Sequence, residues 1–290
     1  MQLGRSPIPV PHHLREQFVN GDDFLPQMRE RGWSVASLRP VYTDPEVIRQ
    51  PWLACPTGTC YADRTLYHLF GITRFRKLLR ALLLRSPGPK TLFTSICPDA
   101  SERETYLTFL RDQELLQEDD QSFRRGVRLF SVKDIGHTLE WYVAEWFRFT
   151  QSHTHLIRAC HGVIFHRSLG LGDIDVAALL DLWTITVECK SSSHVSDQEL
   201  SLFLQRAHLL QPAIAILLID STTATLEELI RRLNRLAEPL QKQFPPLPSL
   251  QGVWGTPSLY VTSVNHSLDT SLTSVLQALE SNEGKHTQEI

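Results

Sequence analysis

The stretch that most constrains the fold of this chain is residues 170–193, GLGDIDVAALLDLWTITVECKSSS. Two apolar runs, IDVAALL and WTITV, lie on either side of a short polar break. Apolar and β-branched runs of about four to eight residues around such a break predict a buried β-hairpin. The first run begins with Asp173 and Asp175, and the second ends with Glu188 and Lys190. The hairpin therefore carries charged residues at the open end of both strands.

The spacing of these four residues predicts that they share one face of the hairpin. With a two-residue loop at residues 181–182, Asp175 lies directly across from Glu188, and Asp173 directly across from Lys190. Side chains alternate along a strand, so all four project from the same face. Opposed Cβ atoms are about 4.5–5.5 Å apart, so the two carboxylates repel each other. A divalent cation that prefers oxygen ligands, such as Mg²⁺, would relieve this conflict. The pattern favours a metal site over a strand pair with solvated charges at its ends.

Asp175, followed one strand later by Glu188-Cys189-Lys190, resembles the motif of the PD-(D/E)xK nuclease superfamily. Restriction-type endonucleases and archaeal Holliday-junction resolvases belong to this superfamily. The resemblance covers about residues 134–220, and the proline that gives the motif its name is absent. It implies that Asp175 and Glu188 bind metal and that Lys190 assists the attack of water. It also implies that the backbone carbonyl of Cys189 is a metal ligand.

A helix is predicted immediately before this core. Residues 133–150, KDIGHTLEWYVAEWFRFT, carry apolar side chains at helical spacing. Many nucleases of the superfamily open with a helix that bears a glutamate in a G-x-x-L-E context, and Gly136…Leu139-Glu140 resembles it. The resemblance implies that Glu140 is a further catalytic and metal-binding acid. Glu145 is the alternative candidate for this acid. An α-helix turns by about 100° per residue, so Glu145 points well away from Glu140, and only one of the two is expected to reach a given metal.

Other polar residues near the motif are candidates for accessory roles. Asp173 falls outside the position of the first acid in the motif, so it is an accessory candidate rather than the main ligand. Gln205 could orient a substrate phosphate or water. His161 and His166 lie in a predicted strand, where a histidine is more often a packed or edge residue than a substrate contact.

Residues 133–282 are expected to form one nuclease-like α/β domain. A strand over residues 156–168 precedes the hairpin, and the helix QELSLFLQRAHLL then leads into the apolar strand AIAILLID. The segment SLYVTSV is a last strand, and HSLDTSLTSVLQALES a final helix. Helical crossovers between parallel strands are right-handed. This order predicts a restriction-endonuclease-like mixed sheet flanked by helices, and residues 283–290 are expected to be a disordered tail.

Residues 63–132 predict a separate, mainly helical unit. Apolar residues recur at helical spacing in RTLYHLFGITRFRKLLRALLLRS, which predicts a helix. The following Pro-Gly-Pro ends this helix, and a short TLFTSI segment comes next. Ser101 and Glu104 have capping-box spacing at the start of the next helix. A polar turn and a strand with basic residues complete a layout that resembles a winged helix-turn-helix domain. Residues 1–62 are expected to be an irregular arm, with a short helix near Phe24–Arg31.

Basic residues cluster in this helical unit. Six basic residues and no acid lie between Arg74 and Lys90. Such clusters suit phosphate contacts, which position a protein on a duplex without reading its sequence. The residues predicted to contact nucleic acid are Arg74, Arg76, Lys77, Arg80, Arg124, Arg125 and Arg128. The acids of residues 118–120, which precede the basic strand, keep open the alternative in which the unit docks a partner protein.

Composition limits the classes of function. A net charge of −3 over 290 residues argues against coating nucleic acid through bulk charge, so contacts must come from local patches. Five cysteines without paired spacing fit reduced thiols, and no second pair joins Cys55 and Cys60 to complete a zinc tetrahedron. The N-terminus has no apolar signal region, and no segment approaches about 18 consecutive apolar residues. We therefore expect a cytoplasmic protein with no membrane partner.

The sequence thus predicts an Mg²⁺- or Mn²⁺-dependent nuclease that hydrolyses phosphodiester bonds, with endonucleolytic cleavage of DNA favoured. Cutting both strands would commonly need two active sites and so a homodimer, but the sequence does not fix the oligomeric state. Two alternatives remain. In one, the fold is retained in a catalytically inactive nucleic-acid-binding or scaffold protein. In the other, the chain is a nuclease subunit that is active only in a larger complex.

Overall fold

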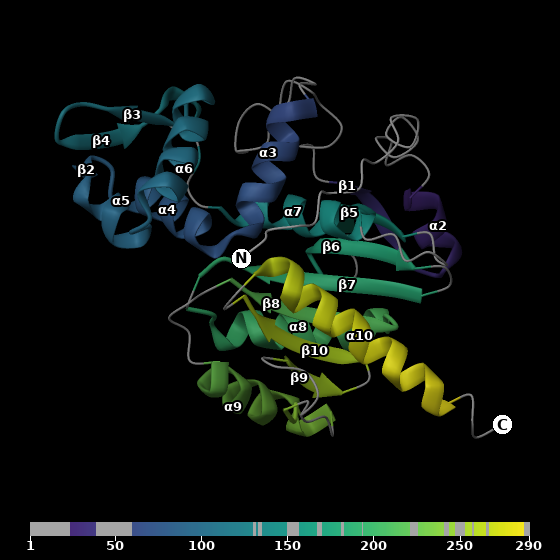
Figure 1. The fold of residues 1–290 in the computed structure, drawn as a ribbon. Helices are drawn as coiled ribbons and strands as arrows, with labels where there is room; N and C mark the ends of the chain where they lie inside the picture. Colours follow the sequence, from purple (N-terminus) through teal and green to yellow (C-terminus); the bar gives the residue numbers. More distant parts are fainter. Residues whose placement is uncertain are drawn as a thin grey trace.

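A computed structural model shows an α/β protein with a large mixed sheet flanked by helices and a smaller helical unit beside it (Figure 1). The structure describes residues 24–38, 60–129, 132, 135–149, 157–166, 170–180, 183–192, 194–220, 226–240, 244–246, 253–256, 258–264 and 267–286. No helix within these ranges is long and apolar enough to cross a membrane.

The large sheet has seven strands in the order β1-β5-β6-β7-β8-β10-β9. The strands are β1 (Val35–Leu38), β5 (Ile157–Phe165), β6 (Asp173–Leu180), β7 (Trp183–Lys190), β8 (Ile214–Ile219), β9 (Val253–Thr256) and β10 (Leu259–Ser263). β7, β8 and β10 are mutually parallel, and the other neighbours are antiparallel. The expectation of a mixed sheet is confirmed. β1 and β9 were not predicted.

Helices cover both faces of this sheet, which explains why its central strands are apolar on both sides. The helices are α2 (Phe24–Glu30), α7 (Gly136–Phe149), α8 (Asp197–Leu210), α9 (Leu226–Ala237) and α10 (Leu268–His286). α7 and α10 share one core cluster with alternate residues of β8 such as Ile216. α8 and α9 pack against the intervening residues, such as Leu217. The crossover through α8 joins the parallel strands β7 and β8, as the sequence predicted.

The helical unit contains a second, three-stranded sheet of order β2-β4-β3. Its elements are α4 (Thr73–Leu84), β2 (Gly88–Pro89), α5 (Thr91–Ile96), α6 (Ala100–Asp112), β3 (Leu116–Glu118) and β4 (Ser122–Arg125). The preceding helix α3 (Cys60–Gly71) was predicted to be continuous with α4. In the structure α3 ends at Gly71 and α4 begins at Thr73, so the two are separate helices. A Cβ at Gly71 would lie 2.9 Å from the hydroxyl of Tyr142, so glycine permits the close approach of α3 to α7. The rings of Tyr67 and Tyr142 stack with centroids 4.7 Å apart. α3 therefore packs on α7, and it shares one hydrophobic cluster with both α7 and α4.

Three further boundaries differ from the sequence expectation. Asp99, not Ser101, caps α6, because its carboxylate accepts a hydrogen bond from the backbone N–H of Glu102 at 2.7 Å. α10 continues to His286, so residues 283–286 of the predicted tail are helical. No proline interrupts this segment, and a single helical glycine costs only about 1 kcal/mol. α2 forms where a short helix was expected, but β1 then pairs with β5, so residues 24–38 belong to the main sheet and its packing.

Candidate functional site

The charged residues of the hairpin lie in the register that the sequence predicts. β6 and β7 pair from Val176 opposite Val187 to Leu180 opposite Trp183. The same register, extended by one residue, brings residue 175 opposite residue 188. Glu188 and Lys190 lie on the face covered by α8, where they contact Arg206 and Glu199. The structure therefore gathers the charges of the motif at one end of two central strands.

Asp175 is buried in this cluster and is fixed by the backbone of the neighbouring strand. Its Oδ2 accepts a hydrogen bond from the N–H of Cys189 at 2.8 Å. Burial, followed by the charges of Glu188 and Glu140, raises the pKa of Asp175 well above its ordinary value. Asp175 is therefore a buried carboxyl whose charged form is opposed by two neighbouring carboxylates.

Glu140 and Glu145 of α7 have different electrostatic neighbours. Glu140 is 6% exposed, and its Oε1 lies 3.3 Å from Nδ1 of His137, one turn earlier on the helix. Its charge acts on Asp175, whereas the charge of Glu145 acts on Tyr67. The helical rotation between the two glutamates thus separates them as expected.

Lys190 is held between two carboxylates. Its Nζ lies 3.0 Å from Oε1 of Glu188 and 3.1 Å from Oε1 of Glu199 on α8. Burial opposes the charged form, but Glu188, Asp175 and Glu199 outweigh it and raise the pKa of Lys190 above its ordinary value. The ammonium group is therefore positively charged at neutral pH. It can orient a water or a phosphate oxygen by donating hydrogen bonds, but in this state it cannot accept a proton.

Glu199 has a second role, at the N-terminus of α8. It forms a capping box with Ser196: the Ser196 hydroxyl accepts from the N–H of Glu199 at 3.2 Å, and Oε2 of Glu199 accepts from the N–H of Ser196 at 2.8 Å. Burial alone would raise the pKa of Glu199, but the hydrogen bonds from Ser196 and Lys190 hold it below its ordinary value. The start of α8 and the position of Lys190 are thereby coupled. The S-x-x-E spacing is the signal in the sequence from which this cap could have been predicted.

Arg206 is a member of the site that the sequence analysis missed. Its Nη1 lies 2.5 Å from Oε2 of Glu188, and its Nε donates to the carbonyl of Leu171 at 2.8 Å. The residue is 8% exposed, although α8 otherwise buries only apolar side chains on this face. The preceding residue, Gln205, which was predicted to be accessory, is exposed. The available signal was an arginine on the buried side of an amphipathic helix, but its partner could not be read from spacing.

The other residues of the motif are placed as follows. Cys189 is buried, and burial followed by the charge of Asp175 raises the pKa of its thiol well above the ordinary value. The Cys189 side chain joins the core cluster under α7, on the face of β7 opposite Glu188 and Lys190. Asp173 is partly exposed at the start of β6, His161 is buried in β5, and His166 is exposed. Cys55, considered above as a zinc ligand, lies outside the described residues.

The donor atoms of the cluster suit a hard divalent cation, since Glu140, Asp175 and Glu188 offer carboxylate oxygens. Their mutual repulsion is the kind of conflict that a cation relieves. Across the ranges that the structure describes, however, no group of three or more His, Cys, Asp or Glu side chains is arranged to hold a metal ion. Both oxygens of Glu188 already contact cations, Lys190 and Arg206. Metal ligation by Glu188 would therefore require it to share or exchange these partners.

Arg76 is not available to nucleic acid, contrary to the prediction from its charge. It lies on the buried face of α4 and is 0% exposed. Its Nε lies 2.8 Å from Oδ2 of Asp220, and its Nη1 donates to the carbonyl of Phe70 at 2.6 Å. Arg80 binds the same carboxylate oxygen at 2.7 Å and is partly buried. Both arginines therefore neutralise a buried acid that follows β8.

Two further arginines of the predicted surface also have internal partners. A guanidinium N–H of Arg125 donates to the carbonyl of Leu83. Arg128 donates to the carbonyl of Gln113 at 3.1 Å. Among the residues predicted to contact nucleic acid, those with exposed side chains are Arg74, Lys77 and Arg124.

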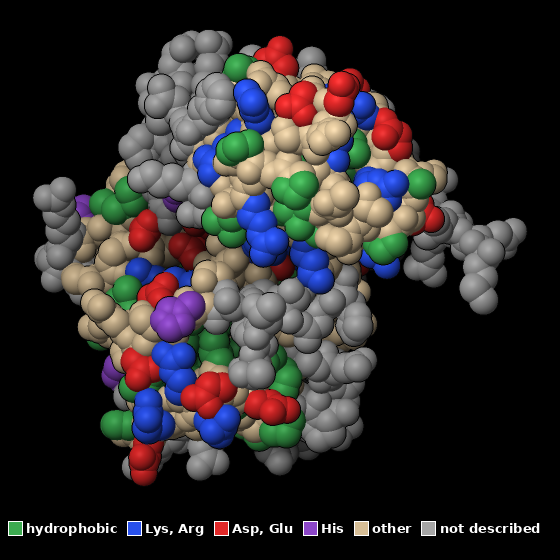
Figure 2. Space-filling view, turned by 90° about the vertical axis from the view of Figure 1, so that its left-hand side faces the viewer, with side chains coloured by type: hydrophobic (Ala, Val, Ile, Leu, Met, Phe, Trp, Pro, Cys, Tyr) green, Lys and Arg blue, Asp and Glu red, His purple; other side chains and the backbone are tan. Residues whose placement is uncertain are grey.

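Figure 2 views the molecule from the left-hand side of Figure 1. Basic side chains lie along the lower part of the helical unit, above a hollow in which acidic side chains are recessed. The exposed face of α6 is more mixed: Arg111 forms an ion pair with Glu104 on this face, and with Glu118 of β3 at 3.6 Å. Basic side chains of the helical unit therefore border the hollow, whereas the arginine of α6 is paired with acids.

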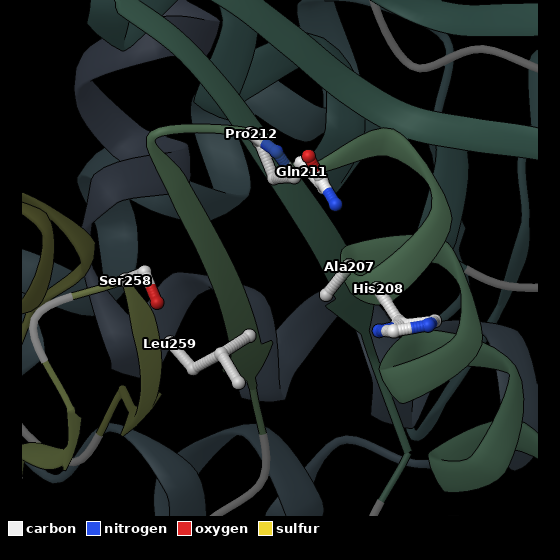
Figure 3. Close-up of a pocket in the computed structure, with 6 residues that line it drawn as sticks. All are labelled: Ala207, His208, Gln211, Pro212, Ser258 and Leu259. Carbon is white, nitrogen blue, oxygen red and sulfur yellow. The ribbon is translucent and has the colours of Figure 1, made fainter. Parts of the chain in front are cut away.

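A separate cavity of about 270 Å³ lies at the other end of β8 (Figure 3). Its lining residues are Ala207, His208, Gln211, Pro212, Ser258 and Leu259. They come from the end of α8, the residues before β8 and the start of β10, whereas Lys190 is paired with Ile219 at the opposite end of β8. The lining contains no carboxylate. This cavity is therefore distinct from the charged cluster.

No protein-family model matches this chain, and no curated protein is significantly similar to it. Among solved structures, the chain is similar to that described as the crystal structure of protein VC1899 from Vibrio cholerae. The TM-score is 0.46 at 18% sequence identity, over 77% of this chain and 58% of that chain. This chain therefore spans less than two thirds of the length of that structure.

Proposed function

We propose that this protein is a divalent-metal-dependent nuclease of the PD-(D/E)xK type, which hydrolyses phosphodiester bonds of nucleic acid, with DNA the favoured substrate. The observation that carries the proposal is the buried cluster of Asp175, Glu188, Lys190 and Glu140 at the open end of a central hairpin. Two carboxylates and a lysine at the end of two buried strands, beside a buried glutamate on α7, contribute nothing to the packing of an apolar core. Nucleases that act through a cation and an assisting lysine need such a set.

Each residue of the cluster has a role in this proposal. Asp175, Glu188 and Glu140 would hold Mg²⁺ or Mn²⁺, together with the backbone carbonyl of Cys189. When bound, such a cation lowers the pKa of water and stabilises charge that develops on the phosphate. The charged Lys190 would position the attacking water and add positive charge near the scissile phosphate. Burial of the cluster strengthens these electrostatic interactions, because the effective dielectric constant is lower than in water.

We further propose that the helical unit is a winged-helix module that guides the substrate. Its order of helix, strand, two helices and hairpin, from α4 to β4, supports this interpretation. The exposed side chains of Arg74, Lys77 and Arg124 would contact phosphates and position the duplex over the hollow. Cleavage of both strands would use the sites of two copies of the chain.

A cleavage assay tests the proposal. Supercoiled plasmid, linear duplex and single strands are incubated with wild-type protein and with Asp175→Asn, in Mg²⁺, Mn²⁺ or EDTA. We expect cutting in either metal, none in EDTA, and loss in the variant, which keeps the size of the side chain. Asp173→Asn, at the partly exposed start of β6, is the matched control and should retain most of the activity. Cutting that persists in Asp175→Asn would contradict the proposed role of the cluster.

A second candidate is a nucleic-acid-binding or scaffold protein that no longer cleaves. The contacts of Lys190 and Arg206 with Glu188 favour it, because internal cations already compensate this acid. DNA binding that is unchanged by EDTA, with no cutting in any metal, would support this candidate. If cutting appears only after a partner protein is added, the chain is instead a subunit of a larger nuclease.

A further inference from the structure

Two residues of α8 contact the charged residues at the end of β7. Glu199 and Arg206 are seven residues apart, about two turns of helix, so their side chains leave the same face of α8. Oε1 of Glu199 lies 3.1 Å from Nζ of Lys190, and Nη1 of Arg206 contacts Oε2 of Glu188. Between them, Nζ of Lys190 lies 3.0 Å from Oε1 of Glu188. The four side chains therefore form one row in which acid and base alternate.

Glu199 is the outermost acid of this row, and its side chain is fixed by the helix itself. It is 41% exposed, compared with 19% for the side chain of Lys190. An exposed ion pair usually contributes little, because two long side chains must lose their freedom to form it. Glu199 has already lost that freedom, since its Oε2 accepts hydrogen bonds from both the N–H and the hydroxyl of Ser196 at 2.8 Å. Its other oxygen, Oε1, is thereby presented to Lys190 in a fixed place.

The second carboxylate restricts the ammonium group of Lys190 in a way that Glu188 alone does not. An ammonium group carries three N–H donors on a flexible stem of four carbons. A single contact with Glu188 leaves Nζ free to move around one oxygen, whereas the contact with Glu199 confines it between two. Two of the N–H donors then face carboxylates. The third is directed away from them, where it can donate to a water or to a phosphate oxygen.

We propose that Glu199 is a positioning residue that holds the ammonium group of Lys190 in place for the attack of water on the phosphate, with the Ser196 cap of α8 as its support. This inference rests on the proposed nuclease function. Glu199 acts through Lys190 rather than on the substrate. Loss of its carboxylate should therefore lower the rate of the chemical step and leave the affinity for nucleic acid nearly unchanged.

The exchange of the Lys190 ammonium protons with water tests the inference without any nuclease activity. Protein labelled with ¹⁵N at lysine is studied by NMR in EDTA, with the exposed Lys77 as the internal comparison. A glutamine side chain can still accept from the N–H of Ser196, so Glu199→Gln should keep the cap while it loses the charge that holds Lys190. Because hydrogen bonds to charged groups are among the stronger ones, the Lys190 protons should exchange about 10-fold faster in this variant.

The matched control is Asp197→Asn, which removes the same charge from the same turn of α8. Asp197 pairs with Arg232 and Arg235 rather than with Lys190. This variant should leave the exchange at Lys190 and the cleavage rate unchanged. Glu199→Gln should instead lower kcat for cleavage by about 10- to 100-fold with KM near the wild-type value, because a small displacement of a catalytic group can cost that much.

Exchange at Lys190 that is equally fast in the wild type and in Glu199→Gln would overturn the inference, and so would an unchanged kcat in a variant with faster exchange. If Glu199→Gln does not fold, the wild type alone is decisive. Lys190 protons that exchange as fast as those of Lys77 would refute the contact, and slower exchange would support it. A wild type with slow exchange at Lys190 that cuts no nucleic acid would instead overturn the proposed nuclease function.

Discussion

Arg76 and Asp220 form an ion pair in which neither side chain has any exposed surface, with Nε and Oδ2 2.8 Å apart. The pair joins α4 to the residue after β8, across 144 positions of sequence. The N–H of Asp220 also donates to the carbonyl of Lys190 at 2.8 Å. The pair therefore joins α4 of the helical unit to the main sheet directly beside the proposed catalytic lysine.

The first prediction concerns this anchor. Arg76→Met leaves Asp220 with only Arg80 as a cationic partner in a buried environment. Removing one member of a buried pair typically costs about 3–5 kcal/mol, because the remaining charge is uncompensated. We expect Arg76→Met to lower the free energy of unfolding by about 3 kcal/mol in urea denaturation. Arg74→Met, which breaks an exposed pair with Glu102, should lower the free energy of unfolding much less, because solvent screens an exposed pair. Equal losses in the two variants would contradict the structural role of Arg76.

The second prediction separates the two glutamates of α7. Glu140→Gln removes a charge that acts on Asp175, whereas Glu145→Gln alters a residue near Tyr67. If Glu140 is a ligand, its loss should lower metal-dependent cleavage by at least about 100-fold, the upper range for outer partners of a metal. Glu145→Gln should stay within a few-fold of the wild type. Rates are measured on supercoiled plasmid at several Mn²⁺ concentrations, and equal activity of the two variants would remove Glu140 from the site.

Much of the site geometry follows from local rules. The two-residue period of strands and the length of the hairpin loop fix which residues of β6 and β7 face each other. The acids and the lysine could therefore be placed on one face from the sequence alone. The crossover through α8 was predictable for a similar reason, because an apolar run after an amphipathic helix leaves few other arrangements. The edge strands β1 and β9 were not predictable, since four-residue strands pair through backbone groups with little sequence signature.

The wrong or missed assignments of arginines arose because charge was interpreted without knowing which side chains are buried. Arg76 was assigned to a nucleic-acid surface because it lies in a basic run, although Leu79 and Leu83 at helical spacing put it on the apolar face of α4. Its partner lies far along the chain, so only the tertiary structure could identify it. The same holds for Arg206, whose charge is explained by Glu188 on another element. Buried arginines are hard to interpret from sequence, because their partners are set by packing.

The third prediction concerns pH and the helical unit. The hydrogen bond from Tyr106, together with Arg74, holds the pKa of Glu102 below its ordinary value. A carboxyl with a lowered pKa stabilises the fold above its unfolded pKa, about 4.3, and this contribution is lost as pH falls through the folded pKa. The melting temperature of Glu102→Gln should therefore lie below that of the wild type at pH 7, and the gap should close toward pH 3. Glu104→Gln, an exposed control on the same helix, should show a smaller gap. A gap that stays constant with pH would contradict the assignment.

The fourth prediction concerns the surface proposed to bind nucleic acid. Lys77 and Arg124 are exposed, whereas the guanidinium of Arg128 is held by the carbonyl of Gln113. Each phosphate contact contributes about 0.9 to the slope of log K against log salt. If both residues contact phosphates, Lys77→Ala with Arg124→Ala should lower that slope by about 1.8 and weaken binding uniformly across sequences. Binding is measured by fluorescence anisotropy with a labelled duplex in EDTA, so that cleavage does not interfere.

The control for this surface is Arg128→Gln, which should leave the salt slope unchanged. If the double variant binds DNA with the wild-type slope, phosphate contacts must lie elsewhere, and the helical unit becomes a candidate surface for a partner protein. Its exposed acids would suit that role, because Glu104 and Asp112 on α6 repel a phosphate backbone. The salt slope of the double variant therefore decides whether this surface binds DNA or a partner protein. Lys77 lies on α4, the helix that Arg76 anchors next to Lys190, so a duplex bound there would be brought toward the proposed catalytic cluster rather than away from it.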